Sequence, residues 1–321
     1  VGGSESANLR YVSHCIKGDA LTVTQANELC EVTTRFRAFE DTNAVQVSTE
    51  VKNVFAENIT VELLSSFVLG GLFGGRKNAD TTYFIKFTQG HHCECQPRRF
   101  SLEQYGFNAY VDGGEKCLTY KNIGSWSSKE ELPQGILEYD GKFLMFQIES
   151  NSHWQYTVSA QKGELNLCLS GGSAFCGNES RELQKGESLQ TPIVAIACGN
   201  SLNAVIGEMT KYRRHIAGRS APDEHLPVIF NEYMHLSWDS ATELNTRKIA
   251  PVAAKAGAEY YVIDCGWHNE EDGDKVYPYV GQWKESKARF PHGVRATTDY
   301  IRSLGMKAGL WIEPEIIGVQ C

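Results

Sequence analysis

Residues 1 to about 200 carry short apolar segments in which hydrophobic and polar positions often alternate, the pattern of strands with one buried face. The segments are rich in Val, Ile, Thr, Phe and Tyr, and clusters of Gly, Asn, Asp or Ser separate them. The expected strands are 20–25, 43–54, 58–69, 81–89, 142–150, 153–160, 164–170 and 191–198. Many short strands at this spacing predict a large antiparallel β-sandwich as the N-terminal domain, residues 1–200.

The pattern changes after residue 200. A linking helix (Leu202–His215) and a loop are expected within 201–226, followed by strands at 228–233, 259–264 and 307–313 with a helix in each interval. Strands that alternate with helices build a parallel sheet covered by helices. A complete (β/α)₈ TIM barrel takes roughly 250 residues. Residues 227–321 are therefore expected to form only its beginning, so that the chain stops inside its second domain.

The first helix of this region has both start and stop signals. Ser240 and Glu243 have capping-box spacing, in which each side chain bonds to the backbone N–H of the other residue. Apolar residues then recur at helical spacing, which predicts one buried face, and Gly257 ends the helix. The residues expected on that face are Ile249, Val252, Ala253 and Ala256.

Composition narrows the class of protein. A formal net charge of −8 and a pI near 5.7 argue against a nucleic-acid surface, and no apolar run is long enough to span a membrane. The ten cysteines are scattered through a chain too large to need stapling, which favours reduced thiols and a cytoplasmic location. The sequence shows no signal peptide. Two glycosylation sequons, at Asn58 and Asn178, would matter if an N-terminal signal had been lost and the protein were secreted.

The candidate chemistry lies at the carboxyl ends of the parallel strands, where ligands bind in α/β domains. Carboxylates accept hydrogen bonds from sugar hydroxyls, and aromatic rings cover the C–H face of a sugar. This combination of residue types therefore suits a carbohydrate. The strand-end residues are Asn231, Glu232 and Tyr233; Asp264, Cys265, Gly266 and Trp267; and Trp311, Glu313 and Glu315.

The segment from Tyr260 to Glu315 closely resembles the start of the catalytic barrel of glycoside hydrolase family 36, the α-galactosidases. It joins "DCGW", "GQW", "FPHG" and "GLWIEPE" in the order of that family. The resemblance implies a retaining enzyme that removes terminal α-linked galactose by double displacement, with one carboxylate as nucleophile and another as acid and base. In the family these aspartates end the fourth and sixth barrel strands, so both catalytic residues are expected beyond Cys321.

The resemblance also implies a substrate subsite. Asp264 would bind the galactose hydroxyls at C4 and C6, Trp311 would line the pocket, and Tyr233 stands where the family often has Trp. Cys265 replaces a second carboxylate with a thiol, a weak hydrogen-bonding group. The expected substrate-binding residues are Asp264, Cys265, Trp311, Tyr233, Trp267 and Glu313.

Because Cys265 departs from the family pattern, three alternatives stay open. They are an α-N-acetylgalactosaminidase, a raffinose-synthase-like transglycosylase and a non-catalytic carbohydrate-binding module. The expected partner is an α-galactoside oligosaccharide, with no nucleic acid and no membrane. Oligomers are frequent in the family, so a homo-oligomer is also considered.

Two clusters contain residue types that bind metals, but neither has the spacing of a known metal site. The acidic loop between Glu270 and Asp274 lacks the alternating ligand order of a calcium-binding EF-hand. The "HHCEC" run at 91–95 lacks the usual spacing of zinc ligands. The sequence therefore predicts neither a metal nor a cofactor.

Overall fold

The computed structural model of the chain forms two units, Val1–Ala217 and Gly218–Cys321. It describes residues 7–74, 81–89, 95–107, 115–161, 164–171, 180–218, 220–236, 241–268, 276–314 and 316–321. Each unit is considered by itself. The predicted linker, 201–226, contributes its helix to the first unit and its loop to the second.

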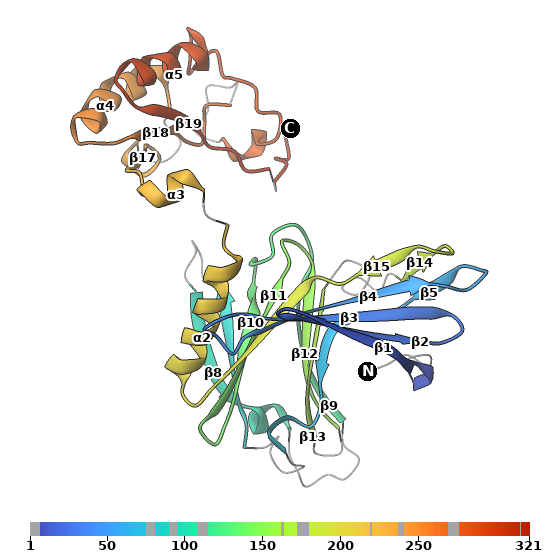
Figure 1. Cartoon of the computed structure of the whole chain (residues 1–321). Helices are drawn as coiled ribbons and strands as arrows, with labels where there is room; N and C mark the ends of the chain where they lie inside the picture. The colour runs from blue at the N-terminus through green and yellow to red at the C-terminus, as the bar shows by residue number, and fades with distance from the viewer. Residues whose placement is uncertain are drawn as a thin grey trace. The chain divides into compact units, whose positions relative to one another are not determined.

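The first unit is built from antiparallel sheets (Figure 1). The larger sheet has the order β1-β2-β3-β4-β16-β11-β10-β7-β8, with β15 also paired to β4. A four-stranded sheet has the order β6-β13-β12-β9, and β14 pairs with β5. The bounds are β1 Arg10–Lys17, β2 Ala20–Ala26, β3 Cys30–Ala38, β4 Val45–Asn53, β5 Ile59–Val61, β6 Ser65–Leu69, β7 Tyr83–Gln89, β8 Cys95–Ser101, β9 Glu115–Asn122, β10 Glu131–Tyr139, β11 Lys142–Glu149, β12 Trp154–Gln161, β13 Glu164–Gly171, β14 Arg181–Leu183, β15 Ser188–Gln190 and β16 Ile193–Gly199. Short 3₁₀ helices lie at η2 Leu72–Gly74 and η3 Leu102–Tyr105.

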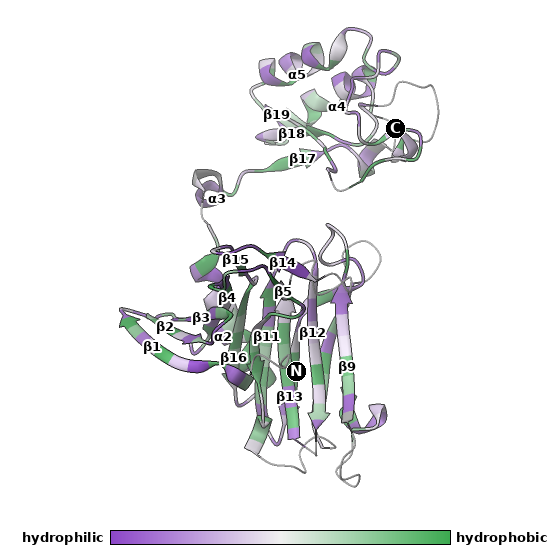
Figure 2. Ribbon diagram, turned by 90° about the vertical axis from the view of Figure 1, so that its right-hand side faces the viewer, coloured by the Kyte–Doolittle hydropathy of each residue, from purple (hydrophilic) through white to green (hydrophobic). Residues whose placement is uncertain are grey.

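The hydrophobic core of this unit lies between the two main sheets. Along β12 every second residue is buried, from Trp154 to Ala160. Figure 2 shows hydrophobic and hydrophilic residues in bands along β12 and β9. Phe84 and Phe146 of the larger sheet meet Tyr156 of the smaller one at ring-centroid distances of 6.0 and 4.9 Å. The predicted β-sandwich is therefore confirmed.

The opposite face of the larger sheet is covered by a helix, α2 (Leu202–Ile216), as Figure 1 shows. Ser201 caps this helix by accepting the Ala204 N–H at 3.1 Å. The helix buries Val205, Met209 and Tyr212 against the sheet. Their neighbours in this cluster include Ile136 and Met145 of the sheet. The predicted helix at 202–215 is confirmed as part of the sandwich unit.

The second unit contains a parallel sheet, β17 (Ile229–Asn231), β18 (Tyr260–Ile263) and β19 (Lys307–Leu310), in that spatial order. Its helices are α4 (Glu243–Lys255) and α5 (Gly293–Ser303), and both pack on the same side of the sheet (Figure 1). Their contacts bury Ala253, Ile301 and Ile263 together. The remaining elements are α3 Ala221–His225, η4 Met234–Leu236 and η5 Tyr277–Tyr279. This strand–helix alternation confirms the predicted beginning of a (β/α)₈ barrel.

The start of α4 corrects one prediction. Thr242 is the N-cap and accepts the Asn245 N–H at 3.2 Å, whereas the Glu243 N–H donates to the Arg289 carbonyl oxygen at 2.9 Å. The Glu243 carboxylate accepts hydrogen bonds from Arg247 Nε and the His292 N–H. Ser240 itself lies outside the described residues, but the predicted capping box is wrong because the Glu243 N–H is taken by the Arg289 carbonyl oxygen and Thr242 is the N-cap.

The buried face of α4 also differs from the prediction. Ala253 is buried as expected, but Val252 and Ala256 are exposed, and Ala250 and Thr246 are buried with it. Helical spacing alone permits several neighbouring faces. In the structure, the helix face that packs against the sheet is the one that carries small side chains.

No disulfide links the cysteines within the part of the chain that the structure describes. In that same part, every helix is too short or too polar to cross a membrane.

Candidate functional site at the strand ends

The parallel sheet directs strand-end residues to two different faces. Side chains alternate along a strand, and residues paired between neighbouring strands lie on the same face. Tyr261 and Ile263 point toward the helices, so Val262 and Asp264 belong to the opposite face. Asn231 pairs with Val262 in the register and therefore joins Asp264 there. The alternation thus brings Asn231 and Asp264 together.

The Asp264 carboxylate is held by two hydrogen bonds. Asn231 Nδ2 donates to Asp264 Oδ2 at 2.5 Å, and the Cys265 backbone N–H donates to Oδ1 at 2.6 Å. The residue is only 6% exposed. Each carboxylate oxygen has two lone pairs, so each can accept a further hydrogen bond. Asp264 is therefore an oriented acceptor at the carboxyl end of the central strand.

Glu232 lies on the helix side of the same strand end and is fully buried. Its Oε2 accepts hydrogen bonds from the Tyr261 hydroxyl at 2.6 Å and the Thr246 hydroxyl at 3.0 Å. Its Oε1 has no hydrogen-bond partner among the described residues. Burial raises the pKa of Glu232 to about 7, with a smaller contribution from the charge of Asp264, while the two hydrogen bonds oppose the shift. Sequence reasoning placed Glu232 at the strand end but did not identify it as a site residue.

Aromatic rings from three loops gather near the carboxyl ends of β18 and β19. Trp267 follows β18, Trp283 comes from the Gly-x-Trp segment, and Trp311 follows β19. The Trp283 ring lies 6.0 Å from Trp267 and 5.8 Å from Trp311 between centroids. Trp267 Nε1 donates to the Trp311 carbonyl oxygen at 2.9 Å, which ties two of the loops together. The structure therefore brings Trp267 and Trp311, two of the predicted site residues, together with a third tryptophan.

Trp283 was not among the predicted site residues, although its Gly-x-Trp motif was noted. Its φ is +53°, in the left-handed region that bulky residues rarely occupy. Such strain costs about 1–3 kcal/mol and persists only where the surroundings impose it. The Ser286 N–H donates to the Trp267 carbonyl oxygen at 2.9 Å, which anchors this loop to the β18 loop. The motif was the available signal for Trp283.

Cys265 and His268 form a buried pair in the same region. Cys265 is 1% exposed and His268 is 3% exposed. Cys265 Sγ lies 4.0 Å from His268 Nε2, and His268 Nδ1 has no partner among the described residues. Burial and the positive charge of Arg289 hold the pKa of His268 below its usual value, so the imidazole is neutral near pH 7. The sequence did not nominate His268.

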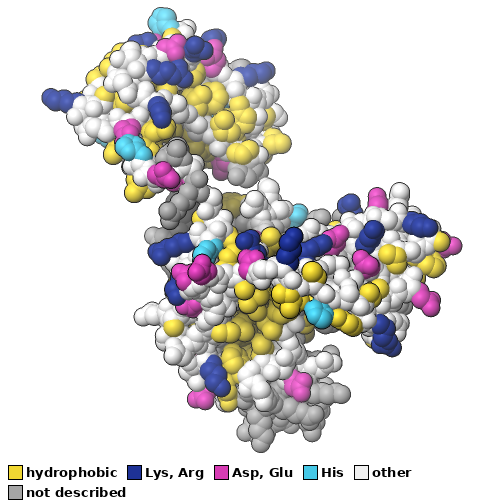
Figure 3. Space-filling model, viewed as in Figure 1, with side chains coloured by type: hydrophobic (Ala, Val, Ile, Leu, Met, Phe, Trp, Pro, Cys, Tyr) yellow, Lys and Arg dark blue, Asp and Glu magenta, His cyan; other side chains and the backbone are white. Residues whose placement is uncertain are grey.

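The other predicted residues lie near the strand ends. Tyr233 is half-buried, and its N–H donates to Asn231 Oδ1 at 2.9 Å. Glu313 is half-buried after β19. Apolar side chains there are partly exposed, with Leu310 at 38%, and Figure 3 shows hydrophobic side chains at the surface of this unit.

The sequence analysis considered two clusters as metal sites and rejected both. The acidic loop, 270–274, lies outside the described residues, and so does the 91–95 run except for Cys95. Among the residues that the structure describes, no group of three or more His, Cys, Asp or Glu side chains could hold a metal ion.

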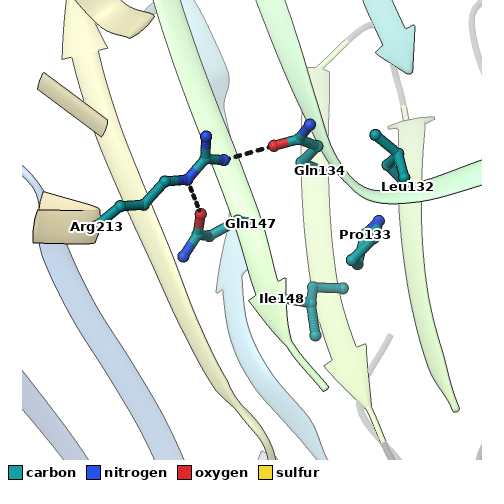
Figure 4. A pocket seen from close by; sticks show the side chains of 6 residues that line it. All are labelled: Leu132, Pro133, Gln134, Gln147, Ile148 and Arg213. Atoms are coloured by element: carbon teal, nitrogen blue, oxygen red, sulfur yellow. Dashed lines mark hydrogen bonds between the residues drawn. The ribbon is translucent and has the colours of Figure 1, made fainter. Parts of the chain in front are cut away.

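A separate cavity of about 340 Å³ opens on the sandwich unit (Figure 4). Arg213 of α2 reaches into it and donates to Gln147 Oε1 at 2.7 Å and Gln134 Oε1 at 2.5 Å. Burial lowers the pKa of Arg213, although the charge of Glu149 opposes this shift. None of the predicted site residues lines this cavity.

Comparison with known proteins agrees with this architecture. Residues 188–321 match the family model described as Melibiase. The α-galactosidase AgaA of Geobacillus stearothermophilus is 32% identical over 137 residues, which cover 42% of this chain and 18% of that protein. Alpha-galactosidase 1 of Pediococcus pentosaceus is 24% identical over 321 residues, which cover 96% of this chain and 40% of that protein. The chain thus spans less than half the length of these relatives.

Solved structures show the same fold. A variant of the GH36 α-galactosidase AgaA from Geobacillus stearothermophilus, in complex with stachyose, superimposes with a TM-score of 0.78 at 22% identity. The match covers 96% of this chain and 44% of that one. A second variant, in complex with raffinose, also has a TM-score of 0.78.

The arrangement of a β-sandwich followed by parallel strands and helices is therefore shared with the solved glycoside hydrolase structures. The family-model match and the relatives agree with this: the chain is similar to the α-galactosidases of glycoside hydrolase family 36.

Proposed function

We propose that the protein containing this chain is a glycoside hydrolase that removes terminal α-linked galactose from oligosaccharides. The observation that carries the proposal is that an oriented carboxylate, Asp264, and the cluster of Trp267, Trp283 and Trp311 both lie at the carboxyl end of the parallel sheet. A carboxylate that accepts hydroxyl hydrogen bonds and rings that cover C–H groups are the two requirements for holding a pyranose.

The site residues have distinct proposed roles. Asp264 accepts hydrogen bonds from sugar hydroxyls, and Asn231 orients it by binding Oδ2. Trp311, together with Tyr233 and Glu313, lines the pocket. Trp267 supports the loop through its hydrogen bond to the Trp311 carbonyl.

The chemical step needs two carboxyl groups that flank the scissile bond. In a retaining enzyme one attacks the anomeric carbon, and the other protonates the leaving oxygen and then activates water. The residues assigned above bind and orient the sugar, and none of them is assigned to this pair.

The known relatives support the substrate class. The curated relatives are α-galactosidases, and two solved neighbours hold raffinose and stachyose. An α-galactoside oligosaccharide is therefore the proposed partner. A cytoplasmic location and homo-oligomerisation also remain predictions.

Cys265 favours a second candidate, an α-N-acetylgalactosaminidase. The thiol has replaced the second carboxylate expected from the family pattern, and a lost charge-assisted hydrogen bond costs about 1.5–3 kcal/mol. A change at this position can therefore alter which substituents of the sugar are accepted.

The test is hydrolysis of nitrophenyl α-galactoside and nitrophenyl α-N-acetylgalactosaminide by the product of the complete reading frame, alongside Asp264→Ala. Cleavage that the variant loses supports the proposal, and the preferred sugar distinguishes the two candidates. A folded protein that cleaves neither substrate would refute the hydrolase assignment. Binding of galactose without cleavage would instead support a carbohydrate-binding module.

A further inference from the structure

The Cys265–His268 pair has a geometry that an ordinary core histidine lacks. A buried imidazole usually has partners for both ring nitrogens, because an unsatisfied buried polar atom costs about 1–3 kcal/mol. The Nε2 atom of His268 lies 4.0 Å from Cys265 Sγ, and Nδ1 has no hydrogen-bond partner among the other described residues, although a backbone hydrogen bond of His268 itself slightly opposes the lowering of its pKa by burial. The packing of neighbouring aromatic rings and the contact with the Cys265 thiol therefore orient the His268 ring.

Three tryptophans hold the His268 ring in place. Its centroid lies 4.9 Å from Trp283, 5.6 Å from Trp267 and 6.2 Å from Trp311. The ring is perpendicular to Trp267 and close to parallel with Trp311. Since these rings belong to the proposed sugar site, the histidine is part of the wall of that site.

The position of the thiol gives the pair its significance. Cys265 follows Asp264 directly, and its own N–H donates to Asp264 Oδ1. A free thiol is a weak acceptor. When S–H donates to a neutral imidazole, electron density at sulfur increases, since linked hydrogen bonds polarise one another. The sulfur can then accept a hydroxyl hydrogen bond more strongly.

We propose that His268 is a positioning residue for substrate recognition: its Nε2 accepts the Cys265 S–H and turns the sulfur into the second acceptor of the sugar site. This inference rests on the proposed function, because it specifies how that site binds a sugar hydroxyl without a second carboxylate. It requires the imidazole to be neutral with its proton on Nδ1.

Three substitutions at His268 distinguish the contribution of Nε2 from that of Nδ1. Glutamine places an amide near the position of Nε2, asparagine places one near Nδ1, and phenylalanine keeps the ring without polar atoms. We expect His268→Gln to retain the KM for nitrophenyl α-galactoside within about twofold. His268→Asn and His268→Phe should raise KM about fivefold with little change in kcat, the size expected for one neutral hydrogen bond. Thermal melts establish that each variant is folded.

A second background distinguishes positioning from structural support. Cys265→Asp provides a carboxylate directly, so His268→Phe should have no effect on KM when combined with it. An equal loss in both backgrounds would show that the imidazole only supports the fold and would overturn the proposal. So would an unchanged KM in His268→Phe alone, or a loss in His268→Gln as large as in His268→Phe. If Cys265→Asp does not fold, the KM values of His268→Gln, His268→Asn and His268→Phe decide whether the proposal holds.

The two levels of inference fail separately. If the wild-type protein neither cleaves nitrophenyl α-galactoside nor binds galactose by calorimetry, the proposed function fails. If the wild-type protein is active and the His268 variants match it, only the role of His268 is refuted.

Discussion

The buried carboxyl of Glu232 makes the stability of the barrel unit depend on pH. Its pKa rises from an ordinary value of 4.5 to about 7 on folding, chiefly because burial disfavours the charged form. The folded protein therefore binds this proton more tightly than the unfolded chain. Its contribution to stability is complete below pH 4.5 and decreases as pH rises to about 7, above which it is constant.

The size of this effect follows from the shift. Each unit of pKa corresponds to 1.36 kcal/mol, so a shift from 4.5 to about 7 corresponds to about 3 kcal/mol between pH 4.5 and pH 8. Glu232→Gln cannot ionise and lacks this decrease. Its amide can still accept from the Tyr261 and Thr246 hydroxyls through oxygen. Its NH₂ group lies on the side of Oε1, so a pH-independent cost of about 1–3 kcal/mol is expected.

The assay is urea denaturation at several pH values from 4.5 to 8, followed by tryptophan fluorescence. The quantity compared is the change in unfolding free energy of the barrel unit across this range, which removes the pH-independent cost. Glu285→Gln is a matched control in the same unit, because hydrogen bonds, chiefly from Lys287, hold the pKa of Glu285 below its usual value. We expect its pH profile to match the wild type. An identical profile in Glu232→Gln would refute the assignment of a buried, proton-binding carboxyl.

Three further substitutions test the core, a helix and the site. Gly135→Ala should destabilise the sandwich by about 1–3 kcal/mol, because the added Cβ would lie 2.7 Å from the Phe146 ring; Gly207→Ala, which meets nothing within 4 Å in a helix interior, should stabilise by about 0.5–1 kcal/mol. Equal melting temperatures for the two variants would contradict this. Asn231→Ala removes the hydrogen bond to Asp264 and should weaken galactose binding about tenfold by calorimetry, whereas undiminished affinity would exclude an orienting role.

Alternation of apolar and polar residues predicted some strands, such as β12, whereas others, such as β3 and β10, were not predicted. β12 was predicted because its apolar residues, from Trp154 to Ala160, alternate with polar ones in the sequence, and the structure buries the apolar set. β10 was missed because it contains Pro133 and Gly135, which are unfavourable in strands. The rings of Phe84 and Phe146 occupy the space beside Gly135, so the sheet itself explains a residue that local preference disfavours.

The candidate site divides in the same way. Asp264 and Trp311 were identified because they end parallel strands, and the period of two then assigns Asp264 to the face of Asn231. Trp283 and His268 lie in loops, where no periodicity indicates direction. Their meeting depends on contacts between segments that are distant in the chain.

The sequence by itself determined the two kinds of domain, the parallel strands of the second and the acceptor at the end of its central strand, because these follow from local periodicity and strand order. Tertiary structure alone decided which face of α4 is buried, the cap of that helix, the proton held by Glu232 and the partner of Cys265. Each of these depends on which groups other segments bring within a few ångströms, and burial there changes the free energy of charges and hydrogen bonds.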